Sequence, residues 1–141
     1  MKVAEMMSRD VQIADPNDSI TQAARTMAMF EIGFLPVGEN DKLIGSLTDR
    51  DLVVRALADG LPVDAKVRDV MTSDVKYCYE DDEVEDITRN MGQNQVRRLP
   101  VVDRDKRLTG IFSIGDAART DPASAGDGLR GVSQPGGPNA H

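Results

Sequence analysis

The chain lacks the residues from which most catalytic and metal sites are built. Its 141 residues include one cysteine, Cys78, one histidine, His141, and no tryptophan. A single cysteine excludes an internal disulfide, and one cysteine with one histidine cannot form a Cys/His zinc cluster within the chain. The sequence has no P-loop, no nucleophile elbow and no mid-chain histidine that could act as a base. We therefore expect no enzymatic activity and no metal site.

Long apolar runs and a positive net charge are also absent. The apolar runs are far shorter than the roughly 20 residues that span a bilayer, so no transmembrane helix is expected. Glu5 interrupts the first residues before any apolar core, which is not typical of a secretory signal. The net charge of −7 argues against a nucleic-acid partner. These features, with the lone cysteine, favour a cytoplasmic protein with no membrane partner.

The main positive feature of the sequence is an internal duplication. A shift of 64 residues superimposes residues 7–42 on 71–106, with the word Leu-Pro-Val in both copies. One extra residue then moves the shift to 65, which superimposes residues 43–51 on 108–116. Ordered matches across a whole unit show that the chain contains two copies of one structural unit.

Each copy is predicted to fold as βαββα, which makes the fold class α/β (α+β). The predicted strands are 11–14, 34–37 and 42–47 in the first copy and 75–79, 98–102 and 108–112 in the second. Apolar residues at helical spacing predict a first helix in each copy, on Ile20, Ala23, Ala24 and Met27 and on Val84, Ile87 and Met91. The second helices are predicted at 49–58 and 114–119. Three methionines, Met27, Met29 and Met91, are expected to fill the core.

These elements divide the chain into a first repeat (1–62), a linker (63–70), a second repeat (71–120) and a tail (121–141). The tail is rich in Gly, Pro, Ser and Ala, a composition that cannot bury a core. It is therefore predicted to be flexible.

The end of the third strand in each copy carries the same short motif. It reads Gly-x-x-Thr-x-x-Asp through Thr48 and Asp51, and Gly-x-x-Ser-x-x-Asp through Ser113 and Asp116. One interpretation is a capping box, in which the hydroxyl and the carboxylate satisfy free N–H groups of the helix that follows. The other is a ligand site, because such a carboxylate can accept hydrogen bonds from both hydroxyls of a ribose. A carboxylate has several lone pairs, so the two roles are compatible.

Paired βαββα units, a Leu-Pro-Val strand and this motif together resemble the tandem cystathionine-beta-synthase (CBS) domain pair, or Bateman module. The words Leu-Thr-Asp-Arg-Asp at 47–51 and Gln-Val-Arg-Arg at 95–98 resemble the stand-alone bacterial proteins of the hypoxic-response type. The resemblance covers residues 3–119. It implies two repeats about a pseudo-twofold axis, with their sheets in contact and the helices outside. It also implies two clefts between the repeats and a homodimer of pairs.

The resemblance further implies that each cleft takes its ribose carboxylate from one repeat and its remaining residues from the other. The main cleft would then combine Thr48, Arg50 and Asp51 with Val75, Lys76, Tyr77, Arg97 and Arg98. Guanidinium groups match phosphate oxygens well. A second, weaker cleft would combine Ser113 and Asp116 with Val11, Ile13 and the pair Gly33-Phe34, which offers no phosphate partner.

Several of these residues have a second interpretation. Arg97 and Arg98 could form a solvated strand edge, and alternation could send their side chains to opposite faces. Tyr77 could be a half-buried strand residue, and Cys78 is expected to be an inert apolar side chain. The acidic run at 80–86 is expected to favour a helix start and not to bind a metal ion.

The expected function is therefore regulatory. The module would sense AMP, ADP or ATP, with S-adenosylmethionine or NAD as other possible ligands, and would pass the signal to an unknown effector protein. The alternative is a ligand-free structural or protein-interaction module that acts by dimerisation or by docking on a partner.

Overall fold

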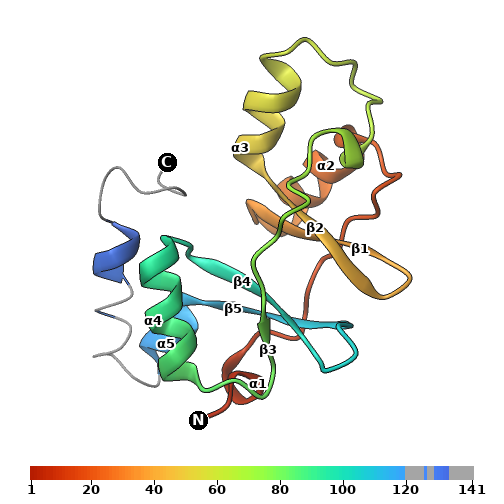
Figure 1. The fold of residues 1–141 in the computed structure, drawn as a ribbon. Coiled ribbons are helices and arrows are strands. Elements are labelled where there is room, and N and C mark those ends of the chain that lie inside the picture. Colours follow the sequence, from red (N-terminus) through yellow and green to blue (C-terminus); the bar gives the residue numbers. More distant parts are fainter. Residues whose placement is uncertain (120–125, 127–128, 134–141) are drawn as a thin grey trace. The chain divides into compact units, whose positions relative to one another are not determined.

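The computed structural model describes residues 1–119, 126 and 129–133 (Figure 1). The chain forms two compact units. Unit 2 is the continuous segment Gln12–Val75, and unit 1 combines Met1–Val11 with the described residues from Lys76 onward. Each unit is considered by itself below. The predicted α/β class is confirmed. Of the predicted first strands, 11–14 is reduced to an isolated bridge at Ala14 and 75–79 to the two residues Cys78–Tyr79.

Unit 2 is built on a two-stranded antiparallel sheet. Strand β1 (Phe34–Glu39) pairs with β2 (Lys42–Thr48), and Ala14 forms an isolated parallel bridge to Val37 on the other edge of β1. Helix α2 (Ile20–Phe30) begins with a Ser19–Gln22 capping box. Helix α3 (Asp49–Asp51) continues directly into the π-helical segment η1 (Leu52–Leu57), and the 3-10 helix η2 (Val67–Asp69) follows.

Unit 1 repeats this plan with one more regular strand. Strands β3 (Cys78–Tyr79), β4 (Arg98–Val102) and β5 (Leu108–Ser113) form one sheet in that order, with β3 parallel and β5 antiparallel to β4. The unit contains helices α1 (Val3–Met6), α4 (Val84–Asn94) and α5 (Ile114–Ala118). Its core holds Met91, Phe112 and Val101, all fully buried.

The compact units do not follow the sequence repeats, because each contains the leading segment of the other repeat. The first eleven residues belong to the unit of the second repeat, where Val3 and Met7 are buried. Residues 65–75 belong to the unit of the first repeat, where Val67 and Val70, within the segment predicted as a linker, are fully buried. Each unit therefore builds its core from residues of both sequence copies. The repeat boundaries drawn from the sequence stay a prediction.

A matching pair of backbone bridges fixes each leading segment. Ser46 pairs with Thr72 in unit 2, and Ile111 pairs with Ser8 in unit 1. Beside each bridge the sheet carries a glycine at which a Cβ atom would lie within 3 Å of the leading segment. At Gly45 it would be 2.8 Å from the Thr72 carbonyl oxygen, and at Gly110 it would be 2.7 Å from that of Ser8. Only glycine allows this approach of the two backbones.

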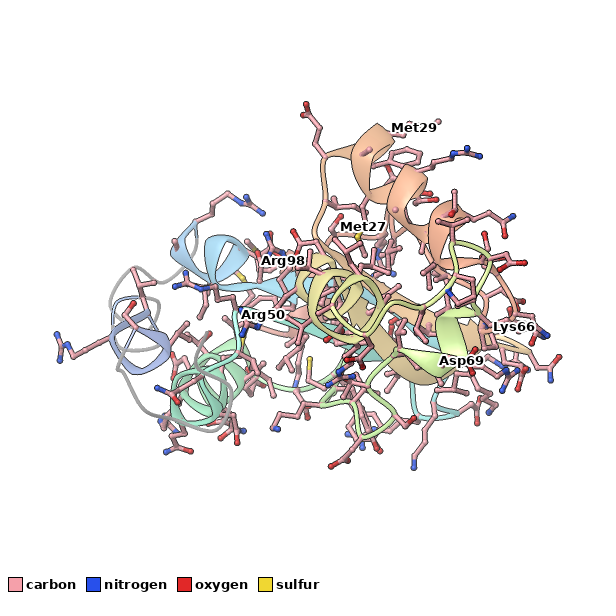
Figure 2. The ribbon with its side chains drawn as sticks, turned by 90° about the horizontal axis from the view of Figure 1, so that it is seen from above. Met27, Met29, Arg50, Lys66, Asp69 and Arg98 are labelled. Atoms are coloured by element: carbon pink, nitrogen blue, oxygen red, sulfur yellow. The ribbon has the colours of Figure 1, made fainter. Side chains whose placement is uncertain are left out.

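Two expectations about packing need correction or comment. Met27 and Met91 are buried as predicted, but Met29 is 75% exposed, and Figure 2 shows it pointing away from the body of its unit. Met29 follows Met27 by two residues, about 200° around a helix, so the two side chains cannot share a face. Most of the predicted tail lies outside the described residues. Residues 129–132, however, are helical and pack against α4.

Candidate functional site

The first copy of the motif forms the junction between β2 and α3. The backbone N–H of Asp51 donates to Thr48 Oγ1 (3.0 Å), and the N–H of Thr48 donates to Asp51 Oδ2 (2.9 Å). This reciprocal pair is the predicted capping box. The Asp51 side chain is 15% exposed, and its second oxygen, Oδ1, lies 3.7 Å from Arg55 Nε. At this distance the two groups form an ion pair, but they are too far apart for a hydrogen bond.

The second copy forms the same junction between β5 and α5. The N–H of Ser113 donates to Asp116 Oδ2 (2.9 Å), and the N–H of Asp116 donates to Ser113 Oγ (3.1 Å). Here the second carboxylate oxygen, Asp116 Oδ1, accepts a hydrogen bond from Arg119 Nη2 and forms an ion pair with it. The two predicted ribose carboxylates thus differ. Among the residues the structure describes, Asp51 Oδ1 accepts no hydrogen bond, whereas Asp116 Oδ1 does.

The residue before the first paired residue of each copy presents an exposed apolar side chain. Ile13 in unit 2 is 51% exposed, and Tyr77, its counterpart in unit 1, is 39% exposed. Val75 is the last residue of unit 2, and the exposed Lys76 is the first residue of this part of unit 1. An exposed apolar side chain of this kind can serve as a platform on which a planar base packs.

Tyr77 belongs to a small cluster of aromatic and basic side chains that the sequence did not reveal. Its ring meets that of Tyr79 edge to face, with 5.8 Å between centroids. Arg104 lies over the Tyr79 ring at 4.2 Å and also holds Asp81 through two hydrogen bonds. A hydrogen bond with Tyr77 raises the pKa of Tyr79. The cluster orders the surface around Tyr77 and leaves that ring partly open to solvent.

The arginine pair Arg97-Arg98 lies at the start of β4 in unit 1, and both side chains are exposed. Arg98 is the strand partner of Ser113, and the Arg97 carbonyl accepts a hydrogen bond from the N–H of Ile114 (3.1 Å). The arginines therefore adjoin the second copy of the motif within one unit. Thr48, Arg50 and Asp51 belong to unit 2, and Figure 2 labels Arg50 and Arg98. The grouping of these residues into one cleft stays a prediction.

The weaker cleft was predicted to use Gly33-Phe34 as the counterpart of the arginine pair. In unit 2, Phe34 is the strand partner of Thr48, and the Gly33 carbonyl accepts a hydrogen bond from the N–H of Asp49 (3.0 Å). A Cβ atom at Gly33 would lie 2.7 Å from the Asp49 carboxylate. A larger residue at position 33 would therefore displace the Asp49 side chain.

Cys78 and the acidic run have the structural roles expected of them. Cys78 is 2% exposed, and burial raises the pKa of its thiol to about 12, so it stays protonated and unreactive at neutral pH. The acidic run precedes and begins α4, where Glu83 bonds Lys2 Nζ at 2.7 Å. Among the described residues no three His, Cys, Asp or Glu side chains gather to hold a metal ion.

Two arginines were missed as members of the candidate sites. Arg55 and Arg119 follow the motif carboxylates by four and three residues. Helical spacing was the available signal, because residues three and four apart lie on the same face of a helix. The arginines nearest the two carboxylates in the described structure are these local ones.

Duplicated units of this topology, each with a hydroxyl and a carboxylate at its strand–helix junction, define a class of small tandem-repeat modules. The sequence model of the CBS domain matches residues 3–57 and 67–122, which is most of the chain. The chain belongs to the CBS domain family. The predicted resemblance is thereby confirmed.

Relatives of similar length match most of the chain. The CBS domain-containing protein YhcV of Bacillus subtilis is 36% identical over 133 residues, covering 93% of this chain and 94% of YhcV. Hypoxic response protein 1 of Mycobacterium tuberculosis is 35% identical over 123 residues, covering 86% and 85%. Inosine-5'-monophosphate dehydrogenase of Methanocaldococcus jannaschii is 41% identical, but the matched region is only 22% of that enzyme. The match to this enzyme is therefore partial and confined to its CBS region.

Solved structures of CBS pairs have the same fold. The structure of Hypoxic Response Protein I with two coordinated zinc ions matches with a TM-score of 0.76 and 33% identity, over 84% of this chain and 98% of that one. The CBS pair of MJ0100, in complex with 5'-methylthioadenosine and S-adenosyl-L-methionine, matches with a TM-score of 0.73 and 29% identity. The match covers 84% of this chain and 94% of that one. CBSX2 in complex with AMP matches with a TM-score of 0.74 and 27% identity, over 84% of this chain and 93% of that one.

Proposed function

We propose that this chain is a regulatory module that senses an adenine nucleotide. Family membership and the adenosine compounds bound to MJ0100 and CBSX2 support a module that binds such ligands. The observation that carries the proposal for this chain is the Thr48–Asp51 junction. One oxygen of its carboxylate is fixed by the cap, and the other accepts no hydrogen bond from the residues the structure describes. Such an oxygen can accept a ribose hydroxyl.

The main site is assigned to Thr48, Arg50 and Asp51 together with Val75, Lys76, Tyr77, Arg97 and Arg98. In this assignment Asp51 holds the ribose, the first strand of the second repeat packs on the adenine, and the arginine pair binds phosphate. A second, weaker site is assigned to Ser113 and Asp116 with Ile13. The bond from Arg119 to Asp116 supports this order of affinity, because the guanidinium already uses one acceptor position of the oxygen that a ribose hydroxyl would approach.

Transmission of the signal is assigned to association with other subunits. Unit 2 exposes apolar side chains on η1, with Val53 at 56%, Val54 at 46% and Leu57 at 76%. Positions i, i+1 and i+4 lie on one side of a helix, so they form one apolar surface. We assign this surface to a homodimer of CBS pairs, with a separate effector protein reading the ligand-dependent change. None of the described helices is long and apolar enough to cross a membrane.

The same apolar surface supports the alternative function, a ligand-free module that acts only by association. Ligand response separates the two. In a thermal-shift screen of AMP, ADP, ATP, NAD and S-adenosylmethionine, a ligand at 100 times its dissociation constant should add about 2.7 kcal/mol to the free energy of unfolding. Native mass spectrometry should show the same ligand bound. No shift and no bound mass with any of the five would favour the alternative.

Tyrosine fluorescence supplies a local readout of the assigned site. The chain has two tyrosines, Tyr77 and Tyr79, and no tryptophan, so its intrinsic emission comes from one cluster. Arg97→Ala and Arg98→Ala should each weaken ATP binding by about tenfold or more, since a charge-assisted hydrogen bond contributes about 1.5–3 kcal/mol when both groups are well placed. Adenosine, which has no phosphate, should bind both variants as it binds the unaltered protein. Equal losses for ATP and adenosine would contradict a phosphate role.

A further inference from the structure

The second helices of the two units have different lengths. In unit 2, the helix runs through α3 and η1 to Leu57, and its Ala56 is 2% exposed within the core cluster. In unit 1, α5 ends at Ala118. The shift of 65 residues aligns Ala56 with Asp121, which has no small apolar side chain to offer a core. The second helix of unit 1 thus has no counterpart of Ala56 in its sequence.

Residues 129–133 pack on unit 1 near the end of α4. Residues 129–132 are helical, and the N–H of Ser133 donates to the Leu129 carbonyl (2.9 Å). Figure 1 shows this short helix (blue) beside α4 (green). Val132 is 8% exposed, whereas Leu129 is 44% exposed. The segment thus has a buried side and an open side.

The contact with α4 is a close approach of two backbones. A Cβ atom at Gly131 would lie 2.4 Å from the Gly92 carbonyl oxygen, so no larger residue fits at position 131 without displacing the segment. Just beyond the end of α4, Gln95 Nε2 donates to the Gly131 carbonyl (3.2 Å). A buried side chain, a glycine contact and a side-chain hydrogen bond together define a specific docking surface on α4.

We propose that residues 129–133 form a C-terminal strap that docks on the surface of α4 around Gly92 and Gln95. The strap adds a buried apolar side chain, Val132, to the surface of unit 1. The surface fits a short helix with glycine at the point of closest approach and a small apolar residue next to it. Because few groups hold the strap, it should open well below the free energy of global unfolding, which makes it a releasable element.

The lone native cysteine makes the docked state measurable. Cys78 is buried and its thiol stays protonated, so a thiol reagent under native conditions reports on an added cysteine. Val132→Cys keeps a small apolar side chain at the docked position, and Leu129→Cys places the same thiol on the exposed side. In the full-length protein, the reagent DTNB should label Val132→Cys at least about tenfold more slowly than Leu129→Cys.

A glycine pair provides the matched control. Adding Gly131→Ala to Val132→Cys should raise its labelling rate to that of Leu129→Cys, because the new methyl group meets the Gly92 carbonyl. Adding Gly126→Ala should leave the rate unchanged, since nothing lies within 4 Å of a Cβ atom there.

Three outcomes would overturn the proposal. The first is equal labelling of Val132→Cys and Leu129→Cys. The second is no acceleration by Gly131→Ala. The third is protection that disappears on dilution, which would show that the segment docks on a second copy of the chain.

Discussion

Unit 1 and unit 2 have the same plan but differ at the junction that would hold a ligand. Both junctions use a hydroxyl and a carboxylate in a reciprocal cap. In unit 2, Arg55 stays 3.7 Å from the Asp51 oxygen that the cap does not use, and in unit 1, Arg119 bonds the corresponding oxygen of Asp116. The two copies therefore share the geometry of the capping box. They differ in the arginine one helical turn later, which bonds the second carboxylate oxygen in unit 1 and does not bond it in unit 2.

The largest expected effect is on ligand binding. Asp51→Ala should weaken the binding of the adenine nucleotide by at least about 100-fold, because two charge-assisted hydrogen bonds to ribose hydroxyls would be lost. The same substitution removes one cap and should cost the fold only about 1 kcal/mol. Asp116→Ala should change the affinity by less than about threefold. Calorimetric titration of both variants checks the comparison.

The reverse result would be decisive against this assignment of the sites. If Asp116→Ala abolished binding and Asp51→Ala left it intact, the arginine pair would act with the junction of its own unit. Arg98 is the strand partner of Ser113, so that outcome has a structural basis. Asp51→Asn is the control for the cap, since its amide oxygen can still accept the hydrogen bond from the Thr48 N–H but the side chain lacks the charge.

The next largest effect concerns stability, and here the two units should behave alike. Gly45→Ala and Gly110→Ala should each destabilise the protein by about 1–3 kcal/mol, because the methyl group meets a backbone carbonyl that cannot rotate away. Urea unfolding measures both. Gly115→Ala, whose methyl group would meet only Ser113 Oγ at 3.5 Å, should be neutral or slightly stabilising. A loss at one glycine but not at the other would show that only one leading segment is tightly docked.

The smallest effect is a pH dependence confined to unit 1. An isolated bridge joins Lys2 to Glu83 in unit 1 and Lys66 to Ser19 in unit 2. The hydrogen bond and charge of Lys2 lower the pKa of Glu83. A carboxyl with a lowered folded-state pKa contributes stability above its ordinary value of 4.5, and this is lost as the pH falls through the lowered value.

Glu83→Gln should accordingly be less stable than the unaltered protein at pH 7 and equally stable at a pH below the lowered pKa. Urea unfolding at the two pH values measures the difference. Since both partners are half exposed, the effect should be small and should shrink further at high salt. A difference that persists in acid would have to come from something other than the charge of Glu83.

Local pattern was enough to predict the repeated elements. Apolar spacing predicted α2 and α4, the Leu-Pro-Val words predicted β1 and β4, and the capping boxes formed where the motif predicted them. Each of these depends on neighbours within a few residues. The predicted site residues at the two junctions likewise have the local geometry that their spacing implies.

Long-range packing was not predictable in the same way. The docking of Val3 and Met7 in the unit of the second repeat depends on contacts across more than half of the chain. The match of Met7 with Met71 was a signal, but it could not say which sheet either residue joins. The helix at 129–132 was hidden by the composition of its surroundings, since Gly, Pro, Ser and Ala make up most of residues 121–141 and, of residues 129–133, only Val132 is buried.

The exchange of leading segments has a consequence for how the chain is made. Unit 2 is continuous from Gln12 to Val75, so all of its parts have been synthesised well before the chain is complete. Unit 1 cannot close until β5 has emerged, because Ser8 pairs with Ile111. Residues 1–11 therefore stay without their pairing partners while the whole of unit 2 is synthesised after them. Slow codons or a chaperone acting during that interval would affect the closing of unit 1 and leave unit 2 untouched.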